Sequence, residues 1–179
     1  TTPEFAAATI CHSPLWGVTR NPWNTRYTTG GSTGGGAAAV ASGMTVLSDG
    51  GDFAGSIRVP SSCCGVFGFQ PPKGRGAMVP PKPLKGWKVA FSPDLGFFQI
   101  DREVAQAVRA SLEAFRALGC TVEEIDLGWD ERAVLAFLVQ SRELGFRRPQ
   151  EMPAKERALL SDYIRHRPKR LARAKNLRY

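Results

Sequence analysis

Residues 87–127 carry the clearest hydrophobic pattern in the chain. The segment WKVAFS at 87–92 alternates between apolar and polar side chains, which predicts a strand. A helix is predicted from an N-cap at Asp101 to Leu118, with Gly119 at the C′ position and a strand at 121–127. The apolar residues that share one face of this helix are Val104, Val108, Leu112, Phe115 and Leu118. A strand, helix and strand of these lengths predict a right-handed parallel crossover.

Before residue 70, short apolar segments alternate with two glycine-rich loops, GGSTGGG at 30–36 and SDGGDFAG at 48–55. The elements predicted around these loops are a helix at 37–43, a buried strand at 44–47, a short helix at 56–64 broken at Pro60, and a strand at 66–69. Two further helices are predicted near 130–144 and 153–174. This mixture of strands and helices predicts an α/β fold.

The charge of the chain is unevenly distributed. The net charge is +8, and residues 1–140 contain twelve basic and twelve acidic side chains, so the whole excess lies in residues 141–179. A basic segment such as 165–178 is one way to bind nucleic acid. No aromatic residues are interleaved there, so we favour a solvated helix face over a nucleic-acid surface. No apolar run is long enough to predict a membrane span.

The cysteine and histidine pattern does not indicate a metal centre. None of the four cysteines, Cys11, Cys63, Cys64 and Cys120, forms a CxxC pair. Only two histidines, His12 and His166, could complete a zinc site. We therefore interpret the cysteines as reduced, packed thiols and expect a cytoplasmic protein.

Each glycine-rich loop presents a serine, Ser32 in the first and Ser56 at the end of the second. Glycines let backbone N–H groups turn toward one point, where they can stabilise an oxyanion, although such loops are also common as plain turns. A serine needs a neighbouring base to become a nucleophile. His12 lies in a loop-like stretch and His166 in a basic helix, so neither suits that role. A lysine acting through a second hydroxyl is the remaining route.

Two other interpretations of the first loop are weaker. Residues 30–34 (GGSTG) satisfy the G-x-S-x-G elbow of α/β-hydrolases, but that elbow needs a buried strand before it and a histidine after an acid. The same loop is not a P-loop, because no Lys–Ser/Thr pair follows its glycines.

The two loops and their flanks resemble the amidase-signature family over about residues 1–75. The resemblance combines NPW at 21–23, GGSTGG at 30–35, D-x-x-GSIR-x-P at 52–60 and CG-x-x-G-x-x-P at 64–71. A weaker resemblance covers 86–127, which is similar to a later strand–helix–strand unit of that family. The fold implied is a truncated amidase-signature α/β core, a mixed sheet flanked by helices.

The resemblance implies a Ser–cis-Ser–Lys triad. Ser56 takes the position of the nucleophile and Ser32 that of the cis-serine, so the Gly31–Ser32 peptide bond is expected to be cis. The oxyanion hole falls on the backbone N–H groups of Phe53, Ala54, Gly55 and Ser56. The residues expected to support the loops are Thr33, Asp52 and Arg58, the last two as an ion pair.

The sequence departs from the family pattern in three respects. The family lysine is expected upstream of Thr1, and we interpret Lys73, Lys82, Lys85 and Lys88 as solvated loop lysines. A short proline-rich link at 76–86 stands where the family has a longer segment, which is either deleted or left out of this sequence. Ala54 replaces a usual glycine, which would matter if that position required a positive φ.

The sequence therefore predicts one partial domain over 1–179, with a signature core at 1–75, the link at 76–86, and the strand–helix–strand unit plus C-terminal helices at 87–179. The expected function is hydrolysis of a small-molecule amide bond through an acyl-serine, in a fragment that is inactive alone. The alternative is a degenerate binding or assembly module with a basic surface. No metal or organic cofactor and no membrane is expected, and the sequence does not indicate an oligomeric state.

Overall fold

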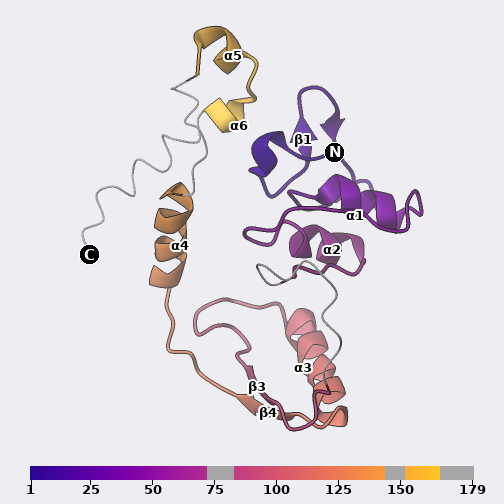
Figure 1. Cartoon of the computed structure of the whole chain (residues 1–179), viewed down its shortest axis with the longest axis vertical. Helices are drawn as coiled ribbons and strands as arrows, with labels where there is room; N and C mark the ends of the chain where they lie inside the picture. Colours follow the sequence, from indigo (N-terminus) through magenta and orange to yellow (C-terminus); the bar gives the residue numbers. More distant parts are fainter. Residues whose placement is uncertain (72–82, 144–151, 166–179) are drawn as a thin grey trace. The chain divides into compact units, whose positions relative to one another are not determined.

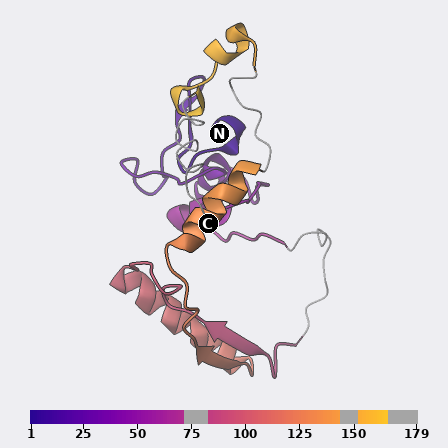
Figure 2. The same ribbon diagram turned by 90° about the vertical axis from the view of Figure 1, so that its left-hand side faces the viewer.

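The computed structural model describes residues 1–71, 83–143 and 152–165. These residues belong to two compact units, which we describe separately (Figures 1 and 2). The first unit contains residues 1–71 together with 152–165. The second unit contains residues 83–143. The α/β class predicted from the sequence is confirmed, because helices accompany a parallel strand pair in the second unit and an antiparallel pair in the first.

The first unit is built around two short helices that pack on each other, α1 (Gly34–Ala41) and α2 (Arg58–Cys64). A 3₁₀ turn η1 (Glu4–Ala6) and the antiparallel pair β1 (His12–Ser13) and β2 (Gly17–Val18) precede them. The side chains that are almost fully buried are Cys11, Thr29, Ser32, Pro60 and Cys64. The interior of this unit is therefore small, partly polar, and centred on the loop that carries Ser32.

Helix α1 begins three residues earlier than predicted, inside the glycine-rich loop. Backbone N–H groups in the first turn of a helix need partners outside it. Here Gly35 N–H donates to the Thr1 carbonyl at 2.9 Å, and the regular i→i−4 bonds of the helix begin with Ala37 N–H, which donates to the Thr33 carbonyl at 3.1 Å. With these donors satisfied, the glycines extend the helix despite their low propensity.

The prediction that Pro60 breaks the second helix is wrong. Helix α2 starts at Arg58, so Pro60 lies in its first turn, where a missing N–H leaves no hydrogen bond unmade. The helix ends at Cys64, and the next residue, Gly65, caps it with a left-handed φ of 66°. The next N–H, of Val66, donates back to the Ser61 carbonyl at 3.0 Å.

The strands predicted at 44–47 and 66–69 are absent, and the expected burial of the first is wrong as well. Val46 is 94% exposed and Phe67 is 91% exposed. Apolar runs predict strands only when a neighbouring strand supplies hydrogen-bond partners and covers one face. In the described part of the first unit, no strand pairs with either run.

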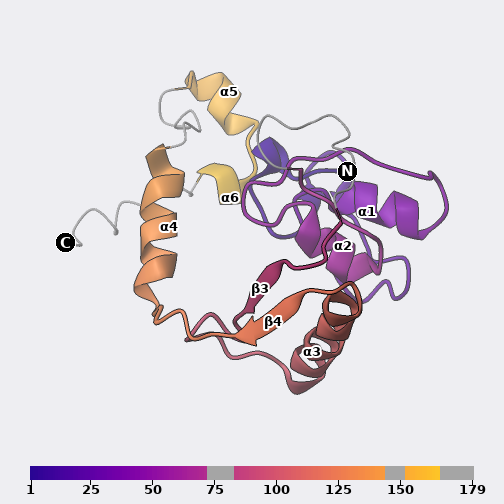
Figure 3. The same cartoon turned by 60° about the horizontal axis from the view of Figure 1, so that its bottom comes forward.

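The second unit confirms the strand–helix–strand prediction. Strands β3 (Lys88–Phe91) and β4 (Thr121–Glu124) pair in parallel, and helix α3 (Arg102–Ala117) connects them and lies beside β4 (Figure 3). The N-cap is Asp101, whose Oδ1 accepts from Glu103 N–H at 2.8 Å. Gly119 has the left-handed φ of 85° expected after a helix end.

Most of the predicted apolar face of α3 is nevertheless exposed. Leu112 is buried at 8% exposure, whereas Val104 and Leu118 near the two ends are 54% and 57% exposed. The cause is the size of the sheet, because two strands of four residues each can cover only the middle of a 16-residue helix.

The remaining helices are α4 (Arg132–Glu143), α5 (Ala154–Ala158) and α6 (Asp162–Arg165). The single helix predicted at 153–174 is therefore interrupted between α5 and α6, and its part beyond 165 lies outside the described residues. Ser161, at the interruption, donates its N–H to a Glu4 carboxylate oxygen at 2.9 Å, which ties this segment to η1. Within the described ranges, no helix has both the length and the apolar character needed to cross a membrane.

Candidate active site

The first glycine-rich loop holds Ser32 in the interior of the first unit. Ser32 is 1% exposed, and the peptide bond between Gly31 and Ser32 is cis, which confirms the geometric prediction. Two glycines leave room for this arrangement. A Cβ at Gly31 would lie 2.6 Å from the Ala8 carbonyl oxygen, and Gly30 has a left-handed φ of 70°. The loop and the segment around Ala8 therefore fit together at backbone distance.

Sequence reasoning missed a polar contact to this loop from Cys11. Its thiol donates to the Ser32 carbonyl at 3.3 Å and accepts from the Gly34 N–H at 3.2 Å. Cys11 is 1% exposed, as expected of a packed thiol. A single cysteine outside any motif gives no sequence signal for such a role, so only the fold could reveal it.

The second loop is organised by the carboxylate of Asp52. Its oxygens accept from the N–H groups of Gly55 at 2.6 Å, Ile57 at 3.1 Å and Arg58 at 3.2 Å. The Arg58 guanidinium adds two bonds of 3.0 Å, so the ion pair expected from the sequence is present. The Arg58 side chain, with the three N–H groups, holds the pKa of Asp52 well below its usual range against the opposing effect of burial.

The stretch before Ser56 is shaped by Gly55 and not by Ala54. Gly55 has a φ of 106°, and a Cβ there would lie 2.9 Å from a Val59 methyl group. Ala54 is not among the non-glycine residues with positive φ. The strain that a positive φ would impose on Ala54 is therefore absent from this structure.

One backbone hydrogen bond joins the two serine loops. The N–H of Thr33, which follows Ser32 directly, donates to the Ser56 carbonyl at 3.0 Å. The Thr33 hydroxyl also donates to the Gly51 carbonyl at 3.5 Å. Loops separated in sequence by α1 and the exposed run after it are thus held side by side, with Ser32 buried and Ser56 partly accessible.

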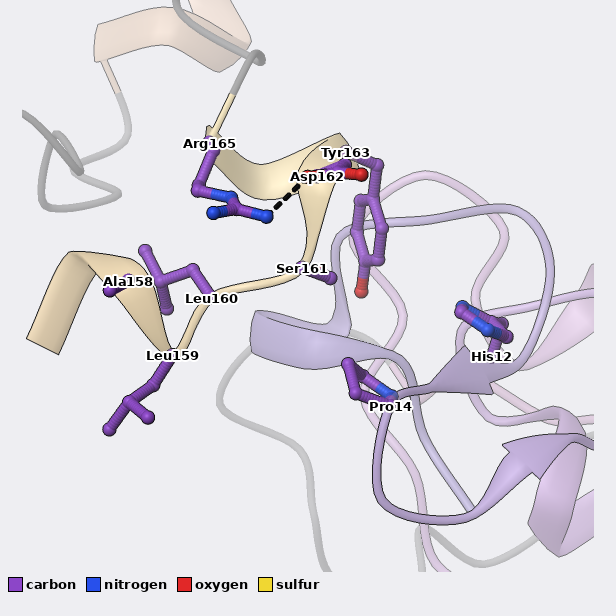
Figure 4. Close-up of a pocket in the computed structure, with 9 residues that line it drawn as sticks. All are labelled: His12, Pro14, Ala158, Leu159, Leu160, Ser161, Asp162, Tyr163 and Arg165. Carbon is purple, nitrogen blue, oxygen red and sulfur yellow. Dashed lines mark hydrogen bonds and ion pairs between the residues drawn. The ribbon is translucent and has the colours of Figure 1, made fainter.

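His12 lies away from these contacts, in β1. It lines a cavity of about 550 Å³ between β1 and the α5–α6 segment (Figure 4). The other lining residues are Pro14, Ala158, Leu159, Leu160, Ser161, Asp162, Tyr163 and Arg165. None of them belongs to either serine loop. Arg165 pairs with Asp162, and burial raises the pKa of Tyr163.

The remaining candidate residues lie in the second unit or outside the described residues. Lys85 and Lys88 are exposed, although Lys88 begins β3 and is not in a loop. Lys73, Lys82 and His166 lie outside the described residues. Across the three described ranges, no group of three or more His, Cys, Asp or Glu side chains is placed to hold a metal ion.

Comparison with known proteins gives the same assignment for the region of the serine loops. Residues 1–80 match the family model described as Amidase. The 6-aminohexanoate-cyclic-dimer hydrolase of a Pseudomonas species is 46% identical over 83 residues, which are 46% of this chain and 16% of the relative. A glutamyl-tRNA(Gln) amidotransferase subunit from Agathobacter rectalis is 30% identical in an alignment that covers 76% of this chain and 37% of the relative.

Two solved structures have the same fold over nearly all of this chain. A 6-aminohexanoate cyclic dimer hydrolase in complex with substrate matches with a TM-score of 0.61 at 20% identity, over 99% of this chain and 49% of the other. The corresponding amidotransferase subunit from Thermotoga maritima also gives 0.61 at 20% identity, over 97% and 52%. The chain thus spans about half the length of these structures, and a smaller share of the curated relatives it matches. The serine loops and the family model therefore agree that residues 1–80 are an amidase-signature region, and the solved structures share the fold.

Proposed function

We propose that this chain carries the nucleophile and the proton relay of an amidase that cleaves a carbon–nitrogen bond through an acyl-serine intermediate. Ser56 is the nucleophile and Ser32 is the relay. The observation that carries the proposal is the Thr33 N–H···O=C Ser56 bond of 3.0 Å, which holds the buried Ser32 loop against the Ser56 loop. Two serines on adjacent glycine-rich loops suit a mechanism in which one hydroxyl activates the other.

In the proposed reaction, Ser56 Oγ attacks the amide carbonyl carbon and its proton passes to Ser32 Oγ. Ser32 passes its own proton to the lysine, which we propose is supplied by sequence preceding Thr1. The lysine proton then returns through Ser32 to the amine nitrogen, the C–N bond breaks, and an acyl-Ser56 ester remains. Water attacks this ester by the same relay, which releases the carboxylic acid and restores Ser56.

The oxyanion of the tetrahedral intermediate is proposed to bind at the backbone of residues 53–56. Preorganised N–H groups are an effective way to stabilise such charge. The Gly55 N–H already donates to Asp52 at 2.6 Å, so its role in the resting structure is to brace the loop. The proposed oxyanion donors are nevertheless all four N–H groups of this stretch, those of Phe53, Ala54, Gly55 and Ser56.

The substrate is proposed to be a small-molecule amide. One relative is named for hydrolysis of a cyclic dimer of 6-aminohexanoate, and another belongs to a glutamyl-tRNA(Gln) amidotransferase. Both names are compatible with chemistry at an amide nitrogen, which a Ser56 acyl-enzyme would accommodate. No metal or organic cofactor takes part in the proposed steps.

The test is covalent labelling by a fluorophosphonate in protein expressed from the complete coding sequence. Wild-type protein should be labelled at Ser56, and Ser56→Ala should lose both labelling and amide hydrolysis while keeping its melting temperature. Ser32→Ala should slow both by about two or more orders of magnitude, because the relay is lost. Ser62→Ala, an exposed serine on α2, is the matched control and should behave as wild type. Amide hydrolysis that survives in Ser56→Ala would refute the assignment.

A further inference from the structure

The Cys11 thiol contacts the Ser32 loop in a way that packing alone does not require. It donates to the Ser32 carbonyl at 3.3 Å and accepts from the Gly34 N–H at 3.2 Å. Both bonds are buried, so water does not compete for either partner. One side chain thus connects the residue proposed as relay to the first residue of helix α1.

The space around the sulfur is matched to the loop. A Cβ at Gly34 would meet the Thr29 hydroxyl and would lie 2.7 Å from Cys11 Sγ, so the sulfur and this hydroxyl together occupy the room that the glycine leaves. Segment 8–11 therefore follows the Ser32 loop closely, with the Ala8 carbonyl facing Gly31 and the Cys11 thiol facing Gly34.

The peptide unit after Ser32 is held at both of its polar atoms. Its carbonyl, from Ser32, accepts from Cys11, and its N–H, from Thr33, donates to the Ser56 carbonyl at 3.0 Å. A peptide unit is planar, so fixing its two polar atoms fixes its orientation. The direction in which the chain leaves Ser32 is thereby set by the thiol on one side and by the nucleophile loop on the other.

We propose that Cys11 is a positioning residue of the amidase site, which orients the Ser32–Thr33 peptide so that the Ser32 hydroxyl faces Ser56. This inference rests on the proposed function and adds a residue that the Ser–Ser–Lys scheme does not include. Cys11 acts through the Ser32 carbonyl and Gly34 N–H and does not touch the substrate.

The discriminating experiment compares Cys11→Ser with Cys11→Val in protein expressed from the complete coding sequence. Serine keeps a donor and an acceptor in a smaller side chain, whereas valine is apolar and somewhat larger than cysteine, and loses both bonds. We expect fluorophosphonate labelling of Ser56 to slow less than about threefold in Cys11→Ser and at least about tenfold in Cys11→Val. The reverse order would show that Cys11 only fills space and would overturn the inference.

Cys120→Val is the matched control. Cys120 is also buried, and its thiol donates to the Leu84 carbonyl at 3.4 Å, but it lies in the second unit. Its replacement should leave Ser56 labelling unchanged. If Cys11→Val does not fold, Cys11→Ala removes the same two bonds without adding a branched side chain and takes its place.

Hydrogen exchange separates failure of this inference from failure of the amidase proposal. Exchange at the Gly34 amide should accelerate about tenfold in Cys11→Val and stay near wild type in Cys11→Ser, whether or not Ser56 is reactive. If wild-type Ser56 is not labelled, the proposed function fails while the exchange result still decides whether Cys11 orients the loop. Equal Gly34 exchange in the two variants would overturn the role of Cys11.

Discussion

The two serine loops are both glycine-rich but are held in different ways. The loop around Ser32 is largely buried and carries no charged side chain, and its contacts include the Ala8 backbone, the Cys11 thiol and the Ser56 carbonyl. The loop before Ser56 is largely exposed and is organised by one carboxylate, Asp52, which accepts five hydrogen bonds. The Ser32 loop is held by close backbone packing that leaves no room for larger side chains. The loop before Ser56 is held by hydrogen bonds and an ion pair to the Asp52 carboxylate.

This difference suits the roles we propose for the two serines. A relay that passes a proton in both directions needs a fixed position, which close backbone packing provides. A nucleophile must meet the substrate, so its loop has to remain open to solvent and must be fixed from one side only. The two loops should therefore respond to different perturbations, the first to added volume and the second to loss of charge.

The largest expected effect is that of Gly31→Ala. The added Cβ would lie 2.6 Å from the Ala8 carbonyl oxygen, where backbone must move to admit it. We expect the free energy of unfolding to fall by about 3 kcal/mol, near the upper end for overpacking. Urea denaturation of the purified protein measures it. Gly51→Ala, in the second loop, is the control, because nothing lies within 4 Å of its added Cβ. Equal losses of unfolding free energy in Gly31→Ala and Gly51→Ala would contradict the proposed difference between the two loops.

Replacement of Asp52 comes next. In Asp52→Ala, the N–H groups of Gly55, Ile57 and Arg58 lose their acceptor, although water can reach part of this loop. We expect a loss of about 2 kcal/mol in the free energy of unfolding and a larger proportional loss of Ser56 labelling. Asp49→Ala, an exposed residue of the same loop, should change neither. Unchanged labelling in Asp52→Ala would mean that the carboxylate does not organise the nucleophile loop.

Whether an element can be predicted from the sequence depends on how far apart in the chain its interacting residues lie. In the second unit, the Asp101 cap, the apolar spacing of α3 and Gly119 are local signals, and the predicted strand, helix and strand follow them closely. Among the described residues of the first unit, no partner strand pairs with the apolar runs at 44–47 and 66–69, and sequence alone does not show which segment would cover Val46 or Phe67.

The candidate site shows the same limit. The cis bond at Ser32 and the Asp52–Arg58 pair were foreseen from a family resemblance and not from any local rule. The role of Cys11 was not foreseen, because a thiol whose partners lie 21 and 23 residues further along the chain leaves no pattern in the sequence. Residues that act through the fold rather than through a motif become visible only once the backbone is placed.

Low pH should affect the two loops differently, so their difference can be tested by changing pH. The pKa of Asp52 is lowered in the folded protein, so its contribution to stability is fully present above the ordinary aspartate pKa of about 3.9 and is lost as pH falls from there toward the folded value. The difference in unfolding free energy between wild type and Asp52→Asn should therefore be largest at neutral pH and shrink below about pH 4. Denaturation in urea at a series of pH values gives this difference. A difference in unfolding free energy that grows as pH falls would contradict the predicted direction.

The smallest effect is expected from Arg58→Ala, and it tests which part of the Asp52 interaction organises the loop. The Arg58 side chain is 62% exposed, so solvent and salt screen its attraction to Asp52. Asp52 would still accept from the three backbone N–H groups, which are what shape the turn before Ser56. Arg58→Ala should therefore lower the melting temperature by much less than Asp52→Ala, and the loss should diminish further in high salt. In the double variant, the melting temperature should match that of Asp52→Ala alone, because Arg58 stabilises the loop only through that carboxylate. Arg58→Ala that destabilises as much as Asp52→Ala would mean that the ion pair, and not the backbone hydrogen bonding, holds the nucleophile loop.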